Sequence, residues 1–270
     1  MNRNKVLEKY EDNWETSMGG WFPGEKVILR GKNVLTELNN DRWVEYLLFG
    51  ITGKHSPRVA RLIEGMWLIC TSFPDPRLWN NRIAALSATA RSTGVLGSAG
   101  ALAISEATIY GLKPIQGVSD FLYRTSEKIA GGQCLEDVVK SEVKKYRGIY
   151  GYGRPVVDQD ERVEPLLDFA RSMGFGDGEY TKLAFSVDEY LANSRLKYRI
   201  NASGVVAGLL ADEGITAKEL YHIATLTFTA GVIPCYIDAL DKPEGAFFPL
   251  RVSRVNYEGT EEHRVWGQQK

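Results

Sequence analysis

Apolar residues recur along most of the chain at the three- and four-residue spacing that is typical of amphipathic helices. The clearest stripe consists of Val59, Leu62, Ile63, Met66 and Ile69. Ser56-Pro57 stands just before it, a pair that favours an N-cap followed by the first helical residue. Residues 161–173 and 180–193 repeat the spacing, so we predict a helix in each of these segments.

A second start signal, Thr216-Ala217-Lys218-Glu219, has the form of a capping box, in which the Glu side chain reaches back to the N-cap amide. We therefore expect a long apolar helix after it. The most apolar long stretch, residues 220–240, contains His222, Pro234 and Asp238. These residues are unfavourable in a membrane span, so the sequence predicts a buried helix and no membrane partner.

Small residues crowd the segment 93–111, where Gly94, Gly97 and Gly100 recur at every third position, close to one face of a helix. We expect another helix to approach closely there, in the core or at a dimer contact. A phosphate loop is disfavoured because no strand precedes the segment. Strand signals are few, and residues 26–30 predict one short strand or hairpin. The whole pattern predicts an all-α protein.

The composition is that of an ordinary globular protein, with 270 residues, a net charge of -1, 44% hydrophobic residues and 25% charged residues. It excludes disordered, collagen-like and disulfide-stapled chains, and the balanced charge offers no electrostatic footprint for nucleic acid. The three cysteines lack paired spacing, which suits a reducing compartment. Residues 1–14 lack the apolar core of a secretory signal, so we expect a cytoplasmic location.

Few residues offer recognisable chemistry on their own. The three histidines, His55, His222 and His263, lack the spacing of metal ligands, so we expect no metal site. Gly151-Tyr152-Gly153-Arg154 predicts an exposed loop. Its amides and guanidinium are suited to an anion, and the alternative is a plain interdomain turn.

A series of segments, in order, carries a resemblance over nearly the whole chain. They are Ile28–Val34, similar to "IRGYDI"; Trp43–Gly50, similar to the helix after it; Asn81–Arg91, in the place of "NAST…AR"; Lys113–Gly117, similar to "GPLHGG"; Gly151–Arg162, similar to "GxGHR…DPR"; and Ile200–Leu210, similar to "NVDG…LLL". Together they resemble the citrate synthase superfamily, especially its short members such as citryl-CoA lyase and the C-terminal part of ATP-citrate lyase.

The resemblance implies a citrate synthase-like, all-α fold that works as a homodimer. A large domain would comprise residues 1–135 and 225–270, and a small domain, residues 136–224, would close over acyl-CoA. The glycine-spaced helix would lie near the dimer contact. The resemblance also implies an acyl-CoA thioester or an organic acid as substrate or ligand, and no tightly bound cofactor.

The positions that carry catalysis in the family hold other residues here. Gln116 stands where a His bonds the thioester enol oxygen, and Arg154 stands where a second His polarises the acceptor carbonyl. Ser203 takes the place of the Asp that removes the α-proton, or Asn201 does after a slip of one or two residues. Pro76 takes the place of the His that binds the oxo-acid.

The resemblance also assigns binding roles and leaves room for replacements. The expected substrate-binding residues are Arg162, Tyr152, Gly153, Arg251 and Arg254. Arg162 matches the "DPR" arginine that holds a carboxylate, and one of the last two matches a C-terminal arginine that reaches the neighbouring subunit's site. Candidate acid–base replacements, chosen for their closeness in sequence to family site positions, are Asp75, Asp120 and Tyr152.

These replacements define the hypotheses for function. Ser203, Asn201 and Gln116 cannot abstract an α-proton near neutral pH, and the loss of such a base costs ~10²–10⁴-fold in rate. Arg154 can stabilise an anion but cannot shuttle protons, because a guanidinium stays charged. The favoured interpretation is a lyase or acyltransferase that reaches its enolate by decarboxylation or carbon–carbon cleavage.

Two further hypotheses stay open. The first is a non-catalytic homologue that binds an acyl-CoA or organic acid and regulates or scaffolds a partner. The second is a conventional citrate synthase, 2-methylcitrate synthase or citryl-CoA lyase. Fold alone does not decide among the three, because one fold hosts several functions.

Overall fold

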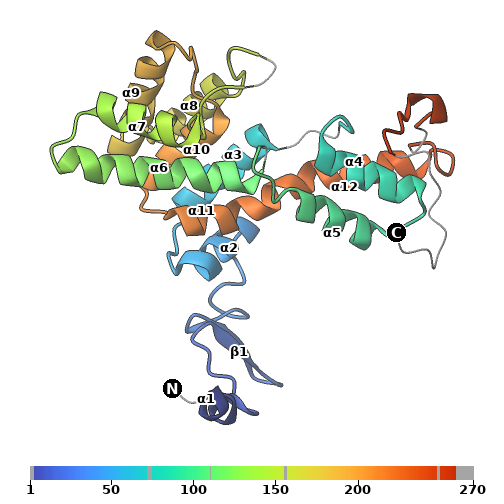
Figure 1. The fold of residues 1–270 in the computed structure, drawn as a ribbon. Helices are drawn as coiled ribbons and strands as arrows, with labels where there is room; N and C mark the ends of the chain where they lie inside the picture. Colours follow the sequence, from blue (N-terminus) through green and yellow to red (C-terminus); the bar gives the residue numbers. More distant parts are fainter. Residues whose placement is uncertain (1–2, 72–74, 110, 155–156, 248–249, 260–270) are drawn as a thin grey trace. The chain divides into compact units, whose positions relative to one another are not determined.

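The computed structural model describes residues 3–71, 75–109, 111–154, 157–247 and 250–259. The chain forms two compact units, of which unit 1 comprises residues 1–73 and 102–230, and unit 2 comprises residues 74–101 and 231–270. Nearly all the regular structure is helical (Figure 1), which confirms the all-α prediction. Each unit is described by itself below.

Helices make up most of both units. Those of unit 1 are α1 Arg3–Tyr10, α2 Trp43–Thr52, α3 Pro57–Cys70, α6 Leu112–Ala130, α7 Leu135–Tyr146, α8 Val163–Ser172, α9 Glu179–Asn193, α10 Ala202–Asp212, α11 Ala217–Ala224 and the 3-10 helix η1 Thr225–Phe228. Unit 2 holds α4 Trp79–Thr89, most of α5 Gly94–Ile104 and of α12 Thr229–Leu240, and the 3-10 helix η2 Val252–Arg254.

The predicted helix starts are confirmed by their caps. The Ser56 hydroxyl accepts the N–H of Val59 at the start of α3. Thr216 and Glu219 form the reciprocal capping box that opens α11. The helices expected over residues 161–173 and 180–193 are α8 and α9.

The predicted strand belongs to a small antiparallel sheet in unit 1. Its strands are β1 Gly19–Phe22, β2 Lys26–Leu29 and β3 Lys32–Asn33, in the order β1-β2-β3. Arg30 follows β2 with a left-handed φ of 47°, and its guanidinium donates to the carbonyls of Gly50 at 3.0 Å and Ile51 at 3.2 Å. A cation at the C-terminal end of α2 complements the helix dipole there, so this contact anchors the sheet.

The core of unit 1 is built around α10, which packs against α6, α8 and α9 (Figure 1). Val205, Leu209 and Leu210 of this helix have essentially no exposed surface. Gly208 allows the close contact with α9, because a Cβ there would lie 3.0 Å from the Cα of Thr181. The N-terminus of α10 is thereby held firmly in the protein interior, which matters for the site described below.

Unit 2 confirms the close approach expected at the glycine-spaced helix. A Cβ at Gly97 of α5 would lie 3.0 Å from the Cβ of Ser87 on α4 and 3.2 Å from the ring of Tyr236 on α12. A Cβ at Gly100 would lie 3.2 Å from the side chain of Ile83. The glycines therefore serve core packing within unit 2, and the dimer contact implied by the resemblance stays a prediction.

The apolar stretch after Thr216 is not one continuous α-helix. The run Ala217–Leu240 is long and apolar enough to cross a membrane by length and composition, a criterion that a core helix also meets. The 3-10 helix η1 interrupts it between α11 and α12. Leu220, Ile223 and Val232 are buried, as a core segment requires.

The predicted domain boundaries differ from the compact units. Residues 136–224, expected to form a small domain, lie wholly inside unit 1. Within that unit α9 and α10 pack against α6, which the prediction placed in the large domain. The compactness of the chain thus divides it elsewhere, and a small closing domain over 136–224 stays a prediction.

Candidate active site

Three of the segments singled out in the sequence converge in unit 1: the start of α6, the loop after α7 and the start of α10. Gly151 lies in the middle, with a left-handed φ of 86°. A Cβ on it would lie 2.5 Å from a methyl carbon of Val118 on α6 and 3.1 Å from the Cα of Gly204 on α10. Only glycine fits between the Val118 side chain and the Gly204 backbone at this distance, so Gly151 allows the three segments to meet.

Backbone hydrogen bonds join the loop to the segment before α10. The N–H of Asn201 donates to the carbonyl of Gly151 at 2.9 Å, and the N–H of Gly153 donates to the carbonyl of Arg199 at 2.6 Å. Tyr152 and Ile200 form an antiparallel bridge between them. The prediction of an exposed loop is wrong at Gly151 and Tyr152, which are buried because these hydrogen bonds fix the backbone against the segment before α10.

Asn201 and Ser203, which the resemblance placed at the position of the family's proton-abstracting Asp, lie at the start of α10. Asn201 is the N-cap: its Oδ1 accepts the N–H of Ser203 at 3.0 Å and that of Gly204 at 3.4 Å. Its amide nitrogen donates to the carbonyl of Gly153 at 3.1 Å. Both ends of the Asn201 side chain are thus used to fix the helix start against the loop.

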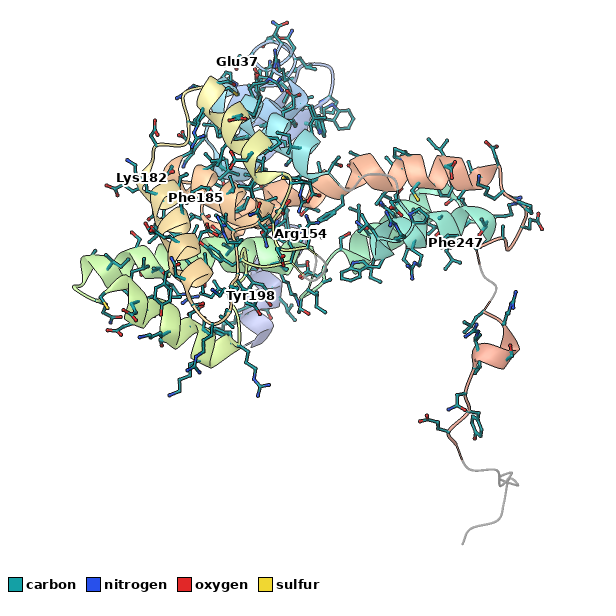
Figure 2. All side chains as sticks on the ribbon, turned by 90° about the horizontal axis from the view of Figure 1, so that it is seen from above. Glu37, Arg154, Lys182, Phe185, Tyr198 and Phe247 are labelled. Atoms are coloured by element: carbon teal, nitrogen blue, oxygen red, sulfur yellow. The ribbon has the colours of Figure 1, made fainter. Side chains whose placement is uncertain are left out.

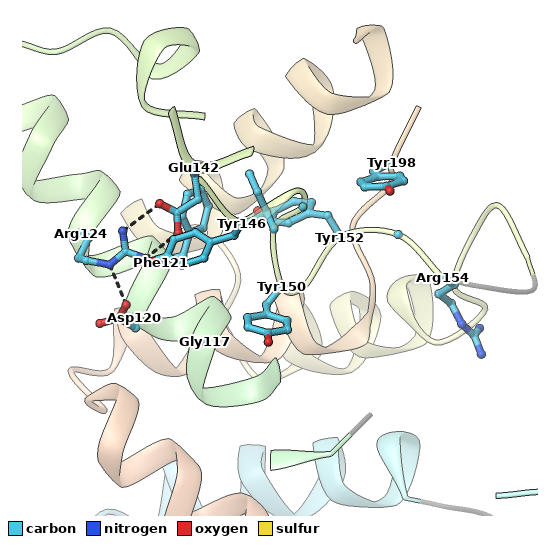
Figure 3. A pocket seen from close by; sticks show the side chains of 13 residues that line it. Gly117, Asp120, Phe121, Arg124, Glu142, Tyr146, Tyr150, Tyr152, Arg154 and Tyr198 are labelled. Carbon is cyan, nitrogen blue, oxygen red and sulfur yellow. Dashed lines mark hydrogen bonds and ion pairs between the residues drawn. The ribbon is translucent and has the colours of Figure 1, made fainter. Parts of the chain in front are cut away.

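A cavity of about 610 Å³ opens beside this convergence. It is lined by Gly117, Asp120, Phe121, Arg124, Glu142, Tyr146, Gly148, Ile149, Tyr150, Tyr152, Gly153, Arg154 and Tyr198. Figure 3 shows the tyrosine rings gathered around it, and Figure 2 locates Arg154 and Tyr198 within unit 1. The volume lies within the range of small-molecule sites, which run from about 300 to 1,000 Å³.

Two tyrosines shape the cavity in different ways. The ring of Tyr150 lies against Gly117, where a Cβ would come within 2.3 Å of it, so glycine is needed for this packing. The hydroxyl of Tyr152 donates to the carbonyl of Ala184 at 2.9 Å, and burial raises its pKa well above the ordinary value. Tyr152 therefore forms part of the wall, and its hydroxyl is not placed for acid–base work.

One end of the cavity is closed by an arginine held between two carboxylates (Figure 3). Arg124 donates from its two Nη atoms to both oxygens of Glu142 at 2.7 and 3.1 Å, and from Nε to Asp120 at 2.7 Å. The hydrogen bond with Glu142 raises the pKa of the guanidinium, although burial opposes this. The pair links α6 to α7, and Asp120 is one of the residues we expected as an acid–base replacement.

At the other end, behind the lining residue Arg154, lies Asp160, which does not itself line the cavity and whose side chain has no exposed surface. Its carboxylate accepts the Nε of Arg162 at 2.8 Å, the Nη2 of Arg162 at 2.7 Å and the N–H of Ala202 at 2.9 Å. Burial by itself would raise the pKa of Asp160, but these hydrogen bonds and the charge of Arg162 outweigh it and lower the pKa to about 2. A permanent anion therefore sits at the N-terminus of α10, where the helix dipole favours it.

Asp160 is the residue that sequence reasoning missed. It lies in the "DPR"-like motif, in which the sequence analysis assigned a role to Arg162 only. A signal was available, because an aspartate two residues before an arginine and ahead of a helix is able to pair with it and cap nearby amides.

Arg154 lies at the same end of the cavity and is turned away from it. Its Nη1 lies 3.4 Å from Oδ1 of Asp160 and forms a short ion pair with Glu161. In Figure 3 the guanidinium points away from the rings of Tyr152 and Tyr198. The arginine that was expected to hold an anion is thus occupied by the protein's own carboxylates.

Gln116 and Cys70 complete the neighbourhood. Gln116 is half-buried near the start of α6, next to Gly117 in the cavity wall, and no hydrogen bond from a described residue engages its side-chain amide. Cys70 at the end of α3 lies within electrostatic reach of Arg162, yet burial outweighs that charge and raises the pKa of the thiol to about 11. The thiol therefore stays protonated near neutral pH and is a poor nucleophile.

The remaining predicted residues belong to unit 2. Asp75 accepts hydrogen bonds from the amide and the Nε of Arg77, both at 2.8 Å. Arg251 precedes the 3-10 helix η2, Arg254 is its last residue, and both are exposed. The cluster in unit 1 does not contain these residues, and their expected roles stay predictions. Among the described residues, no three His, Cys, Asp or Glu side chains gather as metal ligands would.

Sequence comparison finds little, since neither a protein-family model nor a curated protein matches the chain significantly. Solved structures do match. Citryl-CoA lyase from Hydrogenobacter thermophilus superposes with a TM-score of 0.80 at 20% identity, over 93% of this chain and 97% of that one. ATP citrate lyase from Methanosaeta concilii, a D541A mutant in complex with (3S)-citryl-CoA, gives 0.75 at 17% identity, over 97% of this chain and 45% of that one.

Citrate synthase from Thermotoga maritima matches more loosely, with a TM-score of 0.57 at 18% identity over 82% of this chain and 59% of that chain. The agreement is therefore stronger with the lyases than with this synthase. Nearly the full length of the bacterial lyase is matched, so no large part of its architecture lacks a counterpart. The resemblance drawn from short motifs is confirmed at the level of structure: the chain has the citrate synthase-type fold in the short form seen in citryl-CoA lyase.

Proposed function

We propose that the chain binds a coenzyme A thioester in the unit 1 cavity and breaks or forms a carbon–carbon bond next to the thioester carbonyl. The observation that carries the proposal is the convergence of the "GPLHGG"-like, "GxGH"-like and "NVDG"-like segments around one cavity of about 610 Å³. The matched structures support this ligand class. One is a citryl-CoA lyase, and ATP citrate lyases were solved in complex with citryl-CoA and with citrate and coenzyme A.

The cavity has the two properties that such a ligand requires. Five of its thirteen lining residues are aromatic, which suits the apolar and planar parts of a thioester ligand. Exposed cations adjoin these lining residues in the chain: Lys145 and Arg147 flank Tyr146, and Lys197 precedes Tyr198. Phosphate groups form their strongest hydrogen bonds with such cations, so the rim suits the charged end of coenzyme A.

The chemistry of the proposed reaction follows from what the residues cannot do. Asn201 is committed to capping, and Asp160 is saturated by hydrogen bonds and holds its proton only near pH 2, so neither removes an α-proton. A retro-aldol cleavage avoids that step. The bond from the α-carbon to the carbinol carbon breaks, and its electron pair passes into the thioester enolate. The carbinol proton leaves to solvent water, and the enolate later takes a proton from water.

Gln116 is the residue we assign to the enolate oxygen. Its amide N–H₂ is a neutral donor, and the residue lies near the start of α6, next to Gly117 of the cavity wall. One such donor contributes about 10²–10³-fold when it is aimed at developing negative charge. Arg162, fixed by Asp160 yet one-third exposed, keeps N–H groups for a ligand carboxylate.

A second candidate function is favoured by a specific observation. Asp160, Asn201 and Arg162 are all engaged in fixing the start of α10, which is what a binding protein without turnover also needs. In that case the chain binds an acyl-CoA or organic acid and acts on a partner protein.

We also propose a homodimer that uses the outer face of unit 2. Val95 and Leu96 of α5 and Ile237 of α12 are among the exposed apolar residues of that unit. Burial of such residues against a second copy is the usual driving force for association. Size-exclusion chromatography with light scattering measures the mass, and replacement of Val95 and Leu96 by Lys should shift a dimer to a monomer.

The test of function is a panel assay. The protein is incubated with citryl-CoA, malonyl-CoA and β-hydroxyacyl-CoA esters, and with acetyl-CoA plus oxaloacetate, while free thiol and product masses are followed. Cleavage that falls about 10²–10³-fold in Gln116→Ala, but not in the exposed control Gln133→Ala, supports the proposal.

The other outcomes discriminate among the hypotheses. Calorimetric binding of coenzyme A or its thioesters with no turnover across the panel supports the non-catalytic function. Formation of citrate from acetyl-CoA and oxaloacetate shows that a proton-abstracting base exists and overturns our assignment. Absence of both binding and turnover overturns the thioester proposal as a whole.

A further inference from the structure

Arg154 has two carboxylate partners that differ in how firmly they are committed. Asp160 is buried and already accepts hydrogen bonds from the Nε and Nη2 of Arg162 and the N–H of Ala202. Its contact with Arg154, at 3.4 Å, is the longest of these bonds. Asp160 therefore belongs to the framework of the site, and Arg154 is a secondary partner for it.

Glu161 is the opposite kind of partner. Its side chain is 69% exposed, against 0% for Asp160, and its side-chain partner among the described residues is Arg154. Exposed ion pairs are weak, at about 0–1 kcal/mol, because water and salt screen them. Glu161 is thus able to release Arg154 whenever a better anion arrives, whereas Asp160 is not.

The orientation of Arg154 gives this release a consequence. The residue lines the cavity, yet its guanidinium is turned toward Glu161 and away from Tyr152 and Tyr198 (Figure 3). A flexible arginine side chain can swing back toward the cavity only if its ion pair opens. Glu161 therefore competes with any anionic ligand for the same guanidinium.

We propose that Glu161 competes with the ligand for Arg154: it holds the guanidinium outside the cavity until a polycarboxylate ligand displaces it. A ligand with a single carboxylate exchanges one Arg154–carboxylate pair for another and gains little. A ligand with two or three closely spaced carboxylates gains contacts that Glu161 alone does not supply. The ligand class rests on the proposed function, but the restraint on Arg154 does not.

The restraint is measured without any ligand by labelling with phenylglyoxal, which modifies accessible arginines. Peptide mass spectrometry follows Arg154 in wild type, Glu161→Gln and Glu164→Gln. Glu164 is an exposed glutamate in the first turn of α8 and controls for the loss of one nearby charge. The exposed Arg147 is the internal reference in every digest.

We expect Glu161→Gln to label Arg154 about 3- to 5-fold faster than wild type, the factor that corresponds to an exposed ion pair of up to about 1 kcal/mol. Glu164→Gln should label Arg154 at the wild-type rate, and Arg147 should be unchanged throughout. Equal labelling of Arg154 in wild type and Glu161→Gln overturns the proposal.

The competition is measured by calorimetric titration with citrate, a tricarboxylate, and with acetate as the monocarboxylate. Citrate should bind about 3- to 5-fold more tightly to Glu161→Gln than to wild type, and this gain should vanish in an Arg154→Gln background. A gain that persists without Arg154 reflects general charge and overturns the proposal, as does a loss of citrate affinity in Glu161→Gln. Failure of coenzyme A to bind any variant counts against the proposed function instead, and the labelling result still decides the restraint.

Discussion

The two ends of the cavity both contain an arginine–carboxylate cluster, but the two clusters have different roles. At each, an arginine lies between a buried carboxylate and an exposed one: Arg124 between Glu142 and Asp120, and Arg154 between Asp160 and Glu161. At the first end the bidentate bond goes to the buried partner on another helix, so the arginine joins α6 to α7. At the second end the buried partner is already taken by Arg162.

Both ends therefore contain the same residue types. What separates a structural ion pair from an adjustable one is whether the buried carboxylate is available to the arginine or already binds another one. Arg124 makes its bidentate bond to the buried Glu142, which cannot leave. Arg154 makes its closest contact with Glu161, which is free to leave. The following predictions test that contrast, from the largest expected effect to the smallest.

The largest effect should come from Asp160→Asn. The substitution leaves the partly buried guanidinium of Arg162 without its counter-charge and weakens the bond to the N–H of Ala202. Breaking a buried pair by removing one partner costs about 3 kcal/mol or more in the free energy of unfolding. Urea denaturation measures the loss, and the exposed Asp158→Asn serves as the matched control. Equal stability of the two variants would refute the framework role of Asp160.

Acid should remove the same stabilisation without a mutation. The pKa of Asp160 is about 2 in the folded protein, below its ordinary value of 3.8. A depressed pKa contributes stability that is fully present above about pH 4 and is lost as the pH falls toward 2. The contribution should be about 1 to 2 kcal/mol after solvent screening. Denaturation midpoints between pH 5 and 2 should fall less steeply in Asp160→Asn than in wild type; parallel curves would contradict the assignment.

At the other end of the cavity, Glu142→Gln should cost about 1.5 to 2 kcal/mol, since it weakens a charge-assisted, bidentate pair that is only partly exposed. Asp120→Asn, which affects the same guanidinium from the exposed side, should cost less than about 0.5 kcal/mol. Thermal and urea unfolding of both variants give the comparison. If Asp120→Asn proves the more costly, the assignment of structural and adjustable partners at this end is wrong.

The smallest effect on stability should belong to Glu161→Gln, at less than about 0.5 kcal/mol, because the pair it removes is exposed. The same variant should nevertheless change the accessibility of Arg154. A substitution that leaves the unfolding midpoint in place while it accelerates labelling is the signature of an adjustable pair. A large loss of stability would place Glu161 in the framework with Asp160.

Much of the fold follows from local patterns in the sequence. The caps at Ser56 and Thr216, the stripe that became α3 and the short strand after residue 25 are set by neighbours a few residues apart, so the printed order of residues is enough to predict them. The order of the motifs also predicted the fold, because short segments over nearly the whole chain are similar in sequence to the family's motifs. The break at η1 in the apolar stretch was missed, since periodicity alone does not distinguish an α-helix from a short 3-10 turn within it.

The site was only partly predictable. The sequence by itself determined which residue types stand in the segments that resemble the family's motifs, and these gave the prediction that Gln116 and Arg154 take the places of histidines. Only the tertiary structure decided which of these groups are already engaged by other parts of the protein. Asn201 caps α10, the Tyr152 hydroxyl donates to the carbonyl of Ala184, and Arg154 pairs with Glu161. The reason is physical. A residue's chemistry is intrinsic, but its availability depends on competing partners that packing brings together from distant parts of the chain.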